Sequence, residues 1–186
     1  LVFSLSIALS GCLKVDVDID VSRFNTFSGT ALVATADELE ALDSLGLAPT
    51  ARLGEVFKES PGVEIEEYRE DGFSGEKAVF SSAPFSLLEN YKDESSTLSL
   101  RRESQFIIFE GTFDFGSPGI APEGFIEQQA LELLSDINVS VSFPGEVVET
   151  NGTLEDATNT VTWSPALGEK NYFYAKASVG PPIPIW

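Results

Sequence analysis

Cys12 is the residue with the most specific chemistry in this chain, and it is the only cysteine. An aliphatic residue and two small ones, Leu9-Ser10-Gly11, precede it, and this order matches the lipobox of bacterial lipoproteins. In that motif the sulfur is acylated and the chain is cut just before the cysteine. The alternative is an ordinary buried thiol in the first strand. Because an apolar run of signal-peptide length, residues 1–9, ends just before the motif, we favour lipidation of Cys12.

Histidine is absent from the sequence, which limits the chemistry that the other residues can do. Without an imidazole there is no Ser-His-Asp or Cys-His nucleophile pair and no histidine metal ligand. Carboxylates are dense between residues 64 and 71, but nothing apolar flanks a pair of them to shift a pKa. We therefore expect a solvated acidic strand edge there, no catalytic residues, no cofactor and no enzymatic activity.

Asp16, Asp18 and Asp20 have the alternate spacing with which a calcium-binding loop begins. An EF-hand loop also needs Gly at its sixth position and Glu at its twelfth, where this chain has Val21 and Phe27. The other interpretation is the solvent face of a strand, because apolar residues alternate with the aspartates. We favour the solvated strand face and predict no metal ligands.

The net charge of −19 excludes several classes of partner. A field of this sign repels nucleic acid and anionic lipid head groups, so we expect no nucleic-acid binding. Membrane attachment would have to come from a lipid anchor and not from a basic patch. The same charge would attract a basic protein partner, which remains an alternative function.

A second candidate site is a row of large apolar side chains on one face of a predicted strand over 105–115. The row consists of Ile107, Phe109, Gly111, Phe113 and Phe115. A glycine in the middle of a strand marks a bulge or the close approach of another group. The row either packs as core against a helix or forms the wall of an apolar ligand cavity. We favour core packing and keep the cavity wall as the candidate ligand site.

Alternation of apolar and polar residues predicts strands along most of the chain. Hairpins are indicated by turn residues, including Asp71-Gly72 and Asn151-Gly152. The predicted hairpin pairs are 63–66 with 77–81, 97–102 with 105–115, and 147–148 with 161–163. Further strands are expected at 15–21, 27–34, 137–143 and 172–178.

Helical spacing and capping residues predict helices near 35–46, at 53–59 and at 123–135, with a helical turn at 86–91. The sequence thus predicts an α+β fold, mainly an antiparallel β-sheet of hairpins with two to three packed helices. We expect residues 1–11 to be a signal-peptide remnant and 12–179 to be the anchored domain. Residues 180–186 form a Pro-rich tail ending in Trp186, and a transmembrane segment after this tail is left open.

Several short motifs occur in an order that resembles the LppM-type lipoprotein domain family of actinobacteria. The motifs run from Ser10-Gly11-Cys12-Leu13 through Phe27-Ser28-Gly29-Thr30, Asp71-Gly72-Phe73-Ser74-Gly75, Pro84-Phe85, Ser142-Phe143-Pro144-Gly145-Glu146-Val147 and Asn151-Gly152-Thr153 to Asn159-Thr160-Val161-Thr162-Trp163. The resemblance implies a β-rich envelope domain that is anchored at Cys12 and often followed by a C-terminal membrane segment. It also implies a fold like that of lipid-binding proteins, and the family offers no agreed reaction.

Two functional hypotheses follow from these observations. The first is a non-enzymatic lipoprotein at the outer face of the bacterial cytoplasmic membrane, anchored through Cys12, that binds a lipid or glycolipid. The second is an acidic interaction or assembly module at the cell surface that meets a basic protein.

Overall fold

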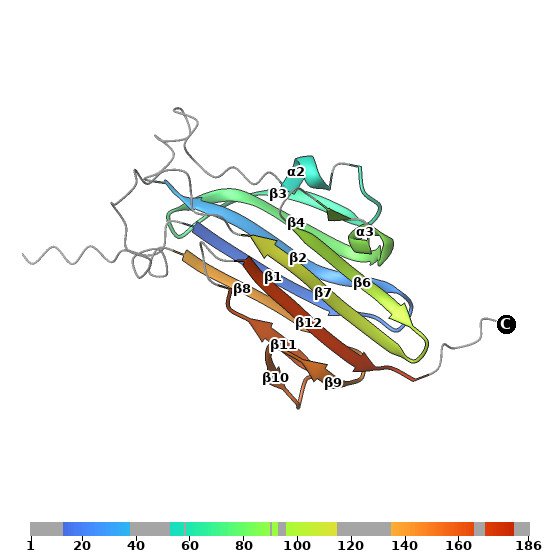
Figure 1. Ribbon diagram of the computed structural model, residues 1–186. Coiled ribbons are helices and arrows are strands. Elements are labelled where there is room, and N and C mark those ends of the chain that lie inside the picture. The colour runs from blue at the N-terminus through green and yellow to red at the C-terminus, as the bar shows by residue number, and fades with distance from the viewer. Residues whose placement is uncertain are drawn as a thin grey trace, which may run out of the picture.

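A computed structural model describes residues 13–37, 53–57, 59–89, 91–92, 96–114, 135–165 and 170–180. These residues form two β-sheets that pack face to face (Figure 1). The seven-stranded sheet has the order β10-β11-β8-β1-β2-β4-β3, and the five-stranded sheet has the order β5-β6-β7-β12-β9. The strands are β1 (Leu13–Val21), β2 (Thr26–Ala36), β3 (Val63–Glu70), β4 (Phe73–Pro84), β5 (Tyr91–Lys92), β6 (Thr97–Glu103), β7 (Phe106–Asp114), β8 (Ser135–Ser142), β9 (Glu146–Thr150), β10 (Thr153–Glu155), β11 (Thr160–Trp163) and β12 (Lys170–Ser178).

The alternation in β1 gives the strand one buried and one exposed face, as predicted. Val15, Ile19 and Val21 are buried, and the three aspartates between Val15 and Val21 are exposed. The β3–β4 hairpin also matches the prediction, because Asp71 and Gly72 form its turn with φ of 56° and 81°. A turn with two positive φ angles matches the twist of the strands that it joins. The predicted β6–β7 hairpin is likewise present.

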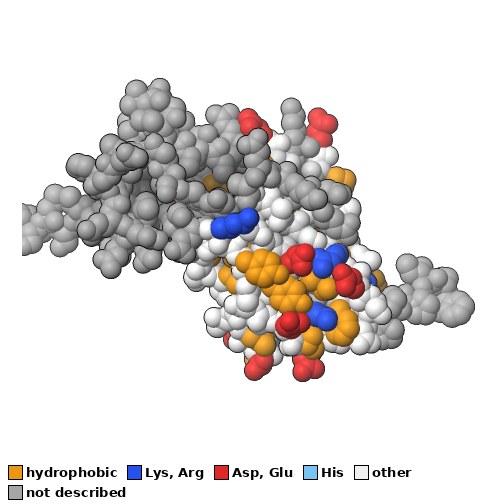
Figure 2. All heavy atoms as spheres, viewed as in Figure 1, with side chains coloured by type: hydrophobic (Ala, Val, Ile, Leu, Met, Phe, Trp, Pro, Cys, Tyr) orange, Lys and Arg blue, Asp and Glu red, His pale blue; other side chains and the backbone are white. Residues whose placement is uncertain are grey.

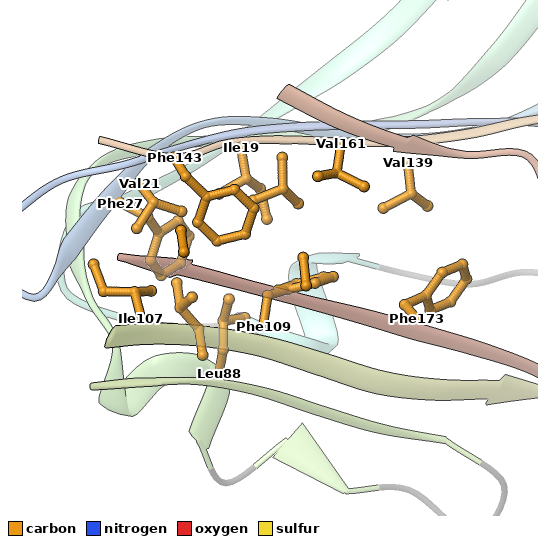
Figure 3. Packing of buried hydrophobic residues seen from close by; sticks show 14 of the residues in the cluster. Ile19, Val21, Phe27, Leu88, Ile107, Phe109, Val139, Phe143, Val161 and Phe173 are labelled. Carbon is orange, nitrogen blue, oxygen red and sulfur yellow. The ribbon is translucent and has the colours of Figure 1, made fainter. Parts of the chain in front are cut away.

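The core lies between the inner faces of the two sheets (Figure 3). From the seven-stranded sheet and the turn after β8, Ile19, Val21, Phe27, Val139, Phe143 and Val161 point toward Ile107, Phe109 and Phe173 of the five-stranded sheet. Because each sheet covers the apolar face of the other, no helical layer is needed to bury either face.

The expected α+β fold with two to three packed helices is therefore wrong. The described helices are α2 (Leu53–Val56) and α3 (Ser86–Glu89), each a single turn of four residues. Thr35 and Ala36, expected at the start of a helix, are the last residues of β2. The predicted helix at 123–135 lies outside the described residues except for Ser135, which begins β8.

Two features of the topology differ from the sequence-based predictions. β1 pairs in parallel with β8, so the sheet is not wholly antiparallel. Asn151-Gly152, predicted as a hairpin turn, instead leads the chain from β9 in one sheet to β10 in the other. The hairpin at this place is formed by β10 and β11, with Asn159 at φ of 53°.

Neither α2 nor α3 approaches the length or the apolar character that a bilayer-spanning helix requires, and no other helix occurs among the described residues.

Candidate functional site

The predicted apolar row lies on the face of β7 that looks toward the seven-stranded sheet. Ile107 and Phe109 are fully buried, Gly111 is also buried, and Phe113 is half-buried. Phe115 lies outside the described residues. Burial therefore decreases along β7 from the middle of the core toward the end of the sandwich.

Four aromatic rings form a continuous line of contacts along this row. The ring centroids are 5.5 Å apart for Phe109 and Trp163, 5.8 Å for Trp163 and Phe173, and 5.6 Å for Phe173 and Phe113. We call Phe109, Trp163, Phe173 and Phe113 the aromatic seam. These tilted and edge-on ring pairs have the geometry that aromatic quadrupoles favour. The seam connects the closed core with its half-buried end at Phe113.

Gly111 makes room for the side chains on either side of the seam. A Cβ atom at this position would lie 3.0 Å from Leu98 Cδ1, 3.0 Å from the carbonyl oxygen of Thr97 and 3.3 Å from Phe113 Cε2. The close approach predicted for a mid-strand glycine is therefore present, and side-chain and backbone atoms of the same sheet provide it.

Asn151 holds the indole of Trp163 in place, a contact that the sequence analysis missed. The Trp163 Nε1–H donates to Asn151 Oδ1 over 2.8 Å, and Asn151 Nδ2 donates to the carbonyl oxygen of Tyr172. The backbone N–H of Tyr174 also donates to Asn151 Oδ1 over 2.9 Å. Gly152 lies against the indole, where an added Cβ would come within 2.6 Å of Nε1. One side chain thus joins β12, in one sheet, to Trp163, in the other.

The half-buried end of the seam lies where the first strand begins. Figure 1 shows that β7 ends and β12 begins at the same end of the sandwich as the start of β1. β1 starts at Leu13, the residue after Cys12 and two residues before the predicted start of this strand at Val15. Cys12 itself lies outside the described residues.

The acidic residues singled out in the sequence lie on exposed faces. Asp16, Asp18 and Asp20 follow one another along the outer face of β1, and Asn138 Nδ2 donates to Asp16 Oδ1 over 3.4 Å. Partial burial, together with the charges of Asp16 and Asp20, raises the pKa of Asp18. Within the described residues, no three Asp, Glu, His or Cys side chains converge as a metal site would need. The carboxylates of Glu64 and Glu66 are exposed on β3, at the edge of its sheet.

Comparisons with known proteins agree on one family. The family model described as LppM domain matches residues 14–179 of this chain. Protein LppM of Mycobacterium tuberculosis is 29% identical over 148 residues, and the match covers 77% of this chain and 57% of that protein. The chain therefore spans little more than half the length of this curated relative. The NMR structure of the folded domain of Mycobacterium tuberculosis LppM has a TM-score of 0.66 and 26% identity, covering 93% of each chain.

Proposed function

Because the chain belongs to the LppM domain family, we propose that it is a membrane-anchored envelope lipoprotein that binds a lipid or glycolipid and catalyses no reaction. The aromatic seam is the observation that carries this proposal. Its rings pack against one another between the sheets, from the buried Phe109 to the half-buried Phe113. Apolar walls with few polar groups are typical of sites that hold acyl chains.

An acyl chain would enter beside Phe113, where burial is incomplete, and lie along the seam toward Trp163. Entry requires Phe113 and Phe173 to move apart, which costs their mutual contact at 5.6 Å. Each CH₂ group of the ligand that leaves water contributes about 0.8 kcal/mol. A few methylene groups therefore offset an aromatic pair, which contributes about 0.5–1.5 kcal/mol beyond its buried area. The polar head group would stay in solvent at the end of the sandwich.

The proposed anchor supports this direction of entry. Acylated Cys12 would directly precede β1, which begins at the end of the sandwich where β7 ends (Figure 1). Anchoring at the outer face of the bacterial cytoplasmic membrane would hold that end close to bilayer lipids. Two or more acyl chains on the cysteine make such an anchor durable.

The test uses Trp163 as a reporter inside the seam. The chain has two tryptophans. The test protein is therefore the 186-residue chain with Cys12→Ser and Trp186→Phe. The probe is lysophosphatidylcholine below its micelle concentration, because its zwitterionic head avoids repulsion by the acidic chain. We expect a saturable change in Trp163 emission, and a flat titration would refute lipid binding along the seam.

A matched pair of variants on β7 localises the effect. Phe113→Ser opens the inner face of the strand at the seam, and Phe106→Ser changes a half-buried phenylalanine on its outer face. We expect Phe113→Ser to raise the Kd at least tenfold, or about 1.4 kcal/mol, and Phe106→Ser to leave it unchanged. Equal effects of the two variants would place the ligand elsewhere.

The row of aspartates on β1 favours a second candidate, an acidic surface that meets a basic protein. Partial burial, and after it the charges of Asp16 and Asp20, raise the pKa of Asp18, so a cationic partner would relieve the repulsion among the three carboxylates. The dependence of binding on salt concentration distinguishes the two functions. Binding through charge weakens steeply as ionic strength rises, whereas burial of an acyl chain does not.

A further inference from the structure

The outer face of the five-stranded sheet carries large side chains. Tyr172 and Tyr174 on β12 have nearly parallel rings, with 14° between their planes and 6.4 Å between their centroids. Tyr172 is 55% exposed, and Val148 on the neighbouring β9 is 51% exposed. Lys176 Nζ lies 4.4 Å from the centroid of the Phe106 ring. Figure 2 shows apolar side chains gathered on this face together with basic and acidic ones.

The charges on this face differ from those of the chain as a whole. Its described side chains include three basic ones, Arg101, Lys170 and Lys176, and four acidic ones, Glu103, Glu110, Glu146 and Glu149. This gives a local net charge of −1, compared with −19 for the chain. Two copies of so acidic a chain repel each other in most relative orientations. The repulsion is weakest when they meet through a nearly neutral face.

We propose that the outer face of the five-stranded sheet is the interface of a homodimer. The strand registers place Arg101, Ile108, Lys176 and Glu149 in one row across β6, β7, β12 and β9. The row begins with a guanidinium and ends with a carboxylate. A two-fold axis parallel to the strands, midway between β7 and β12, reverses the row on the second copy. Arg101, which pairs with Glu103 and Glu110 of its own chain, then also faces Glu149 of the partner subunit, and the same pair forms twice.

The neighbouring row is complementary under the same operation. Glu110 lies beside Tyr174 in the register of β7 and β12. The two-fold axis brings the Glu110 carboxylate opposite the hydroxyl of the partner's Tyr174, which can donate to it in place of Glu149, its acceptor within the chain. Ile108 lies opposite the partner's Lys176 but is only 5% exposed, so it offers this side chain little surface. Aromatic residues and arginine are also the side chains enriched at the centres of protein interfaces.

The face is large enough for a stable dimer. The four strands β6, β7, β12 and β9 have 7, 9, 9 and 5 residues. With strands about 4.8 Å apart and about 3.4 Å per residue, they cover roughly 490 Å² per copy, before the extra area of protruding side chains is counted. Two copies together reach roughly the 1,000 Å² that a specific interface needs. An axis parallel to the strands also keeps Leu13 of both copies at the same end, so two Cys12 anchors could reach one membrane.

Analytical ultracentrifugation of the Cys12→Ser chain tests the proposal at an ionic strength of about 0.15 M, where the Debye length is about 8 Å. We expect a monomer–dimer equilibrium. Arg101→Glu and Glu149→Arg should each raise its Kd at least tenfold, and the double variant should restore the original Kd. Lys77→Glu, on the outer face of the other sheet, is the control and should change nothing. A monomer at all concentrations, or a Kd insensitive to both single exchanges, would overturn the proposal.

A thiol pair tests the symmetry independently of affinity. Residues 101 and 149 lie three strands apart, roughly 14 Å, which is too far for a disulfide within one copy. In the Cys12→Ser background, Arg101→Cys with Glu149→Cys should give a covalent dimer under mild oxidation. Arg101→Cys with Glu66→Cys, on opposite faces of the molecule, should remain monomeric. If both pairs cross-link equally, or the first does not, the proposed axis is wrong.

Discussion

Replacing Asn151 by alanine should destabilise the fold, because this side chain makes three hydrogen bonds. It accepts from Trp163 Nε1 and from the Tyr174 N–H, and it donates to the Tyr172 carbonyl oxygen. Trp163 is 7% exposed, so loss of its acceptor leaves a buried donor unpaired, at a cost of about 1–3 kcal/mol. The two more exposed bonds contribute about 0.5 kcal/mol each, at the lower end of the usual range.

The expected loss from Asn151→Ala is therefore about 3 kcal/mol in the free energy of unfolding. In a chain of this size, each kcal/mol of lost stability lowers the Tm by about 2–4 °C, so a loss of about 3 kcal/mol should lower it by about 6–12 °C. Asn151→Asp keeps an acceptor and loses only the donor, so it should cost about 1 kcal/mol. Urea unfolding followed by circular dichroism gives the free energies, and calorimetry gives the Tm.

A double-mutant cycle with Trp163→Phe isolates the contact. Because phenylalanine has no N–H, Asn151→Ala should cost at least about 1 kcal/mol less in the Trp163→Phe background. If the cost is the same in both backgrounds, within about 0.5 kcal/mol, the hydrogen bond to the indole does not join the two sheets as we describe.

Three further predictions concern other parts of the fold. Gly111→Val should cost about 1–3 kcal/mol in urea unfolding, because its side chain meets Leu98 and the Thr97 carbonyl; an unchanged midpoint would contradict this packing. Arg102→Met should cost about 2 kcal/mol and expose the Gly180 end to proteases, since Arg102 donates to the carbonyl oxygens of Arg23 and Gly180; equal proteolysis rates would argue against it. Asp18→Asn should raise the Tm at pH 7 and lose this gain toward pH 3. The raised pKa means that ionising Asp18 destabilises the folded state as pH rises, and a gain independent of pH would refute this sign.

Local alternation predicted most strands, because each one buries a single face. The β1, β3–β4 and β6–β7 assignments needed only neighbouring residues and turn chemistry. Division into two sheets could not be predicted in this way. The parallel pairing of Leu13 with Ser135 joins residues far apart in sequence, and no local pattern encodes it. For the same reason Asn151-Gly152 was predicted as a hairpin turn, although it joins strands of different sheets.

The candidate site was predicted in part. The two-residue repeat of a strand correctly predicted that Ile107, Phe109, Gly111 and Phe113 share one face, since alternate side chains of a strand point to the same side. Their partners Trp163 and Phe173 come from distant strands, so the aromatic seam was not visible in sequence. Of the residues that hold the seam, Asn151 was singled out in the sequence only as part of the Asn151-Gly152 turn signal, 12 residues before Trp163. The exposure of Tyr172 was not predicted, because Tyr172-Phe173-Tyr174 places aromatic side chains on both faces of β12 and does not show which face meets solvent.

Native mass spectrometry of the Cys12→Ser chain, purified without detergent, tests the proposed lipid binding most directly. We expect a co-purifying mass that denaturation releases as a lipid, and the Phe113→Ser chain should carry less of it. The Phe106→Ser chain should carry as much as the parent. A ligand-free mass that persists after incubation with envelope lipids would refute the proposed lipid binding.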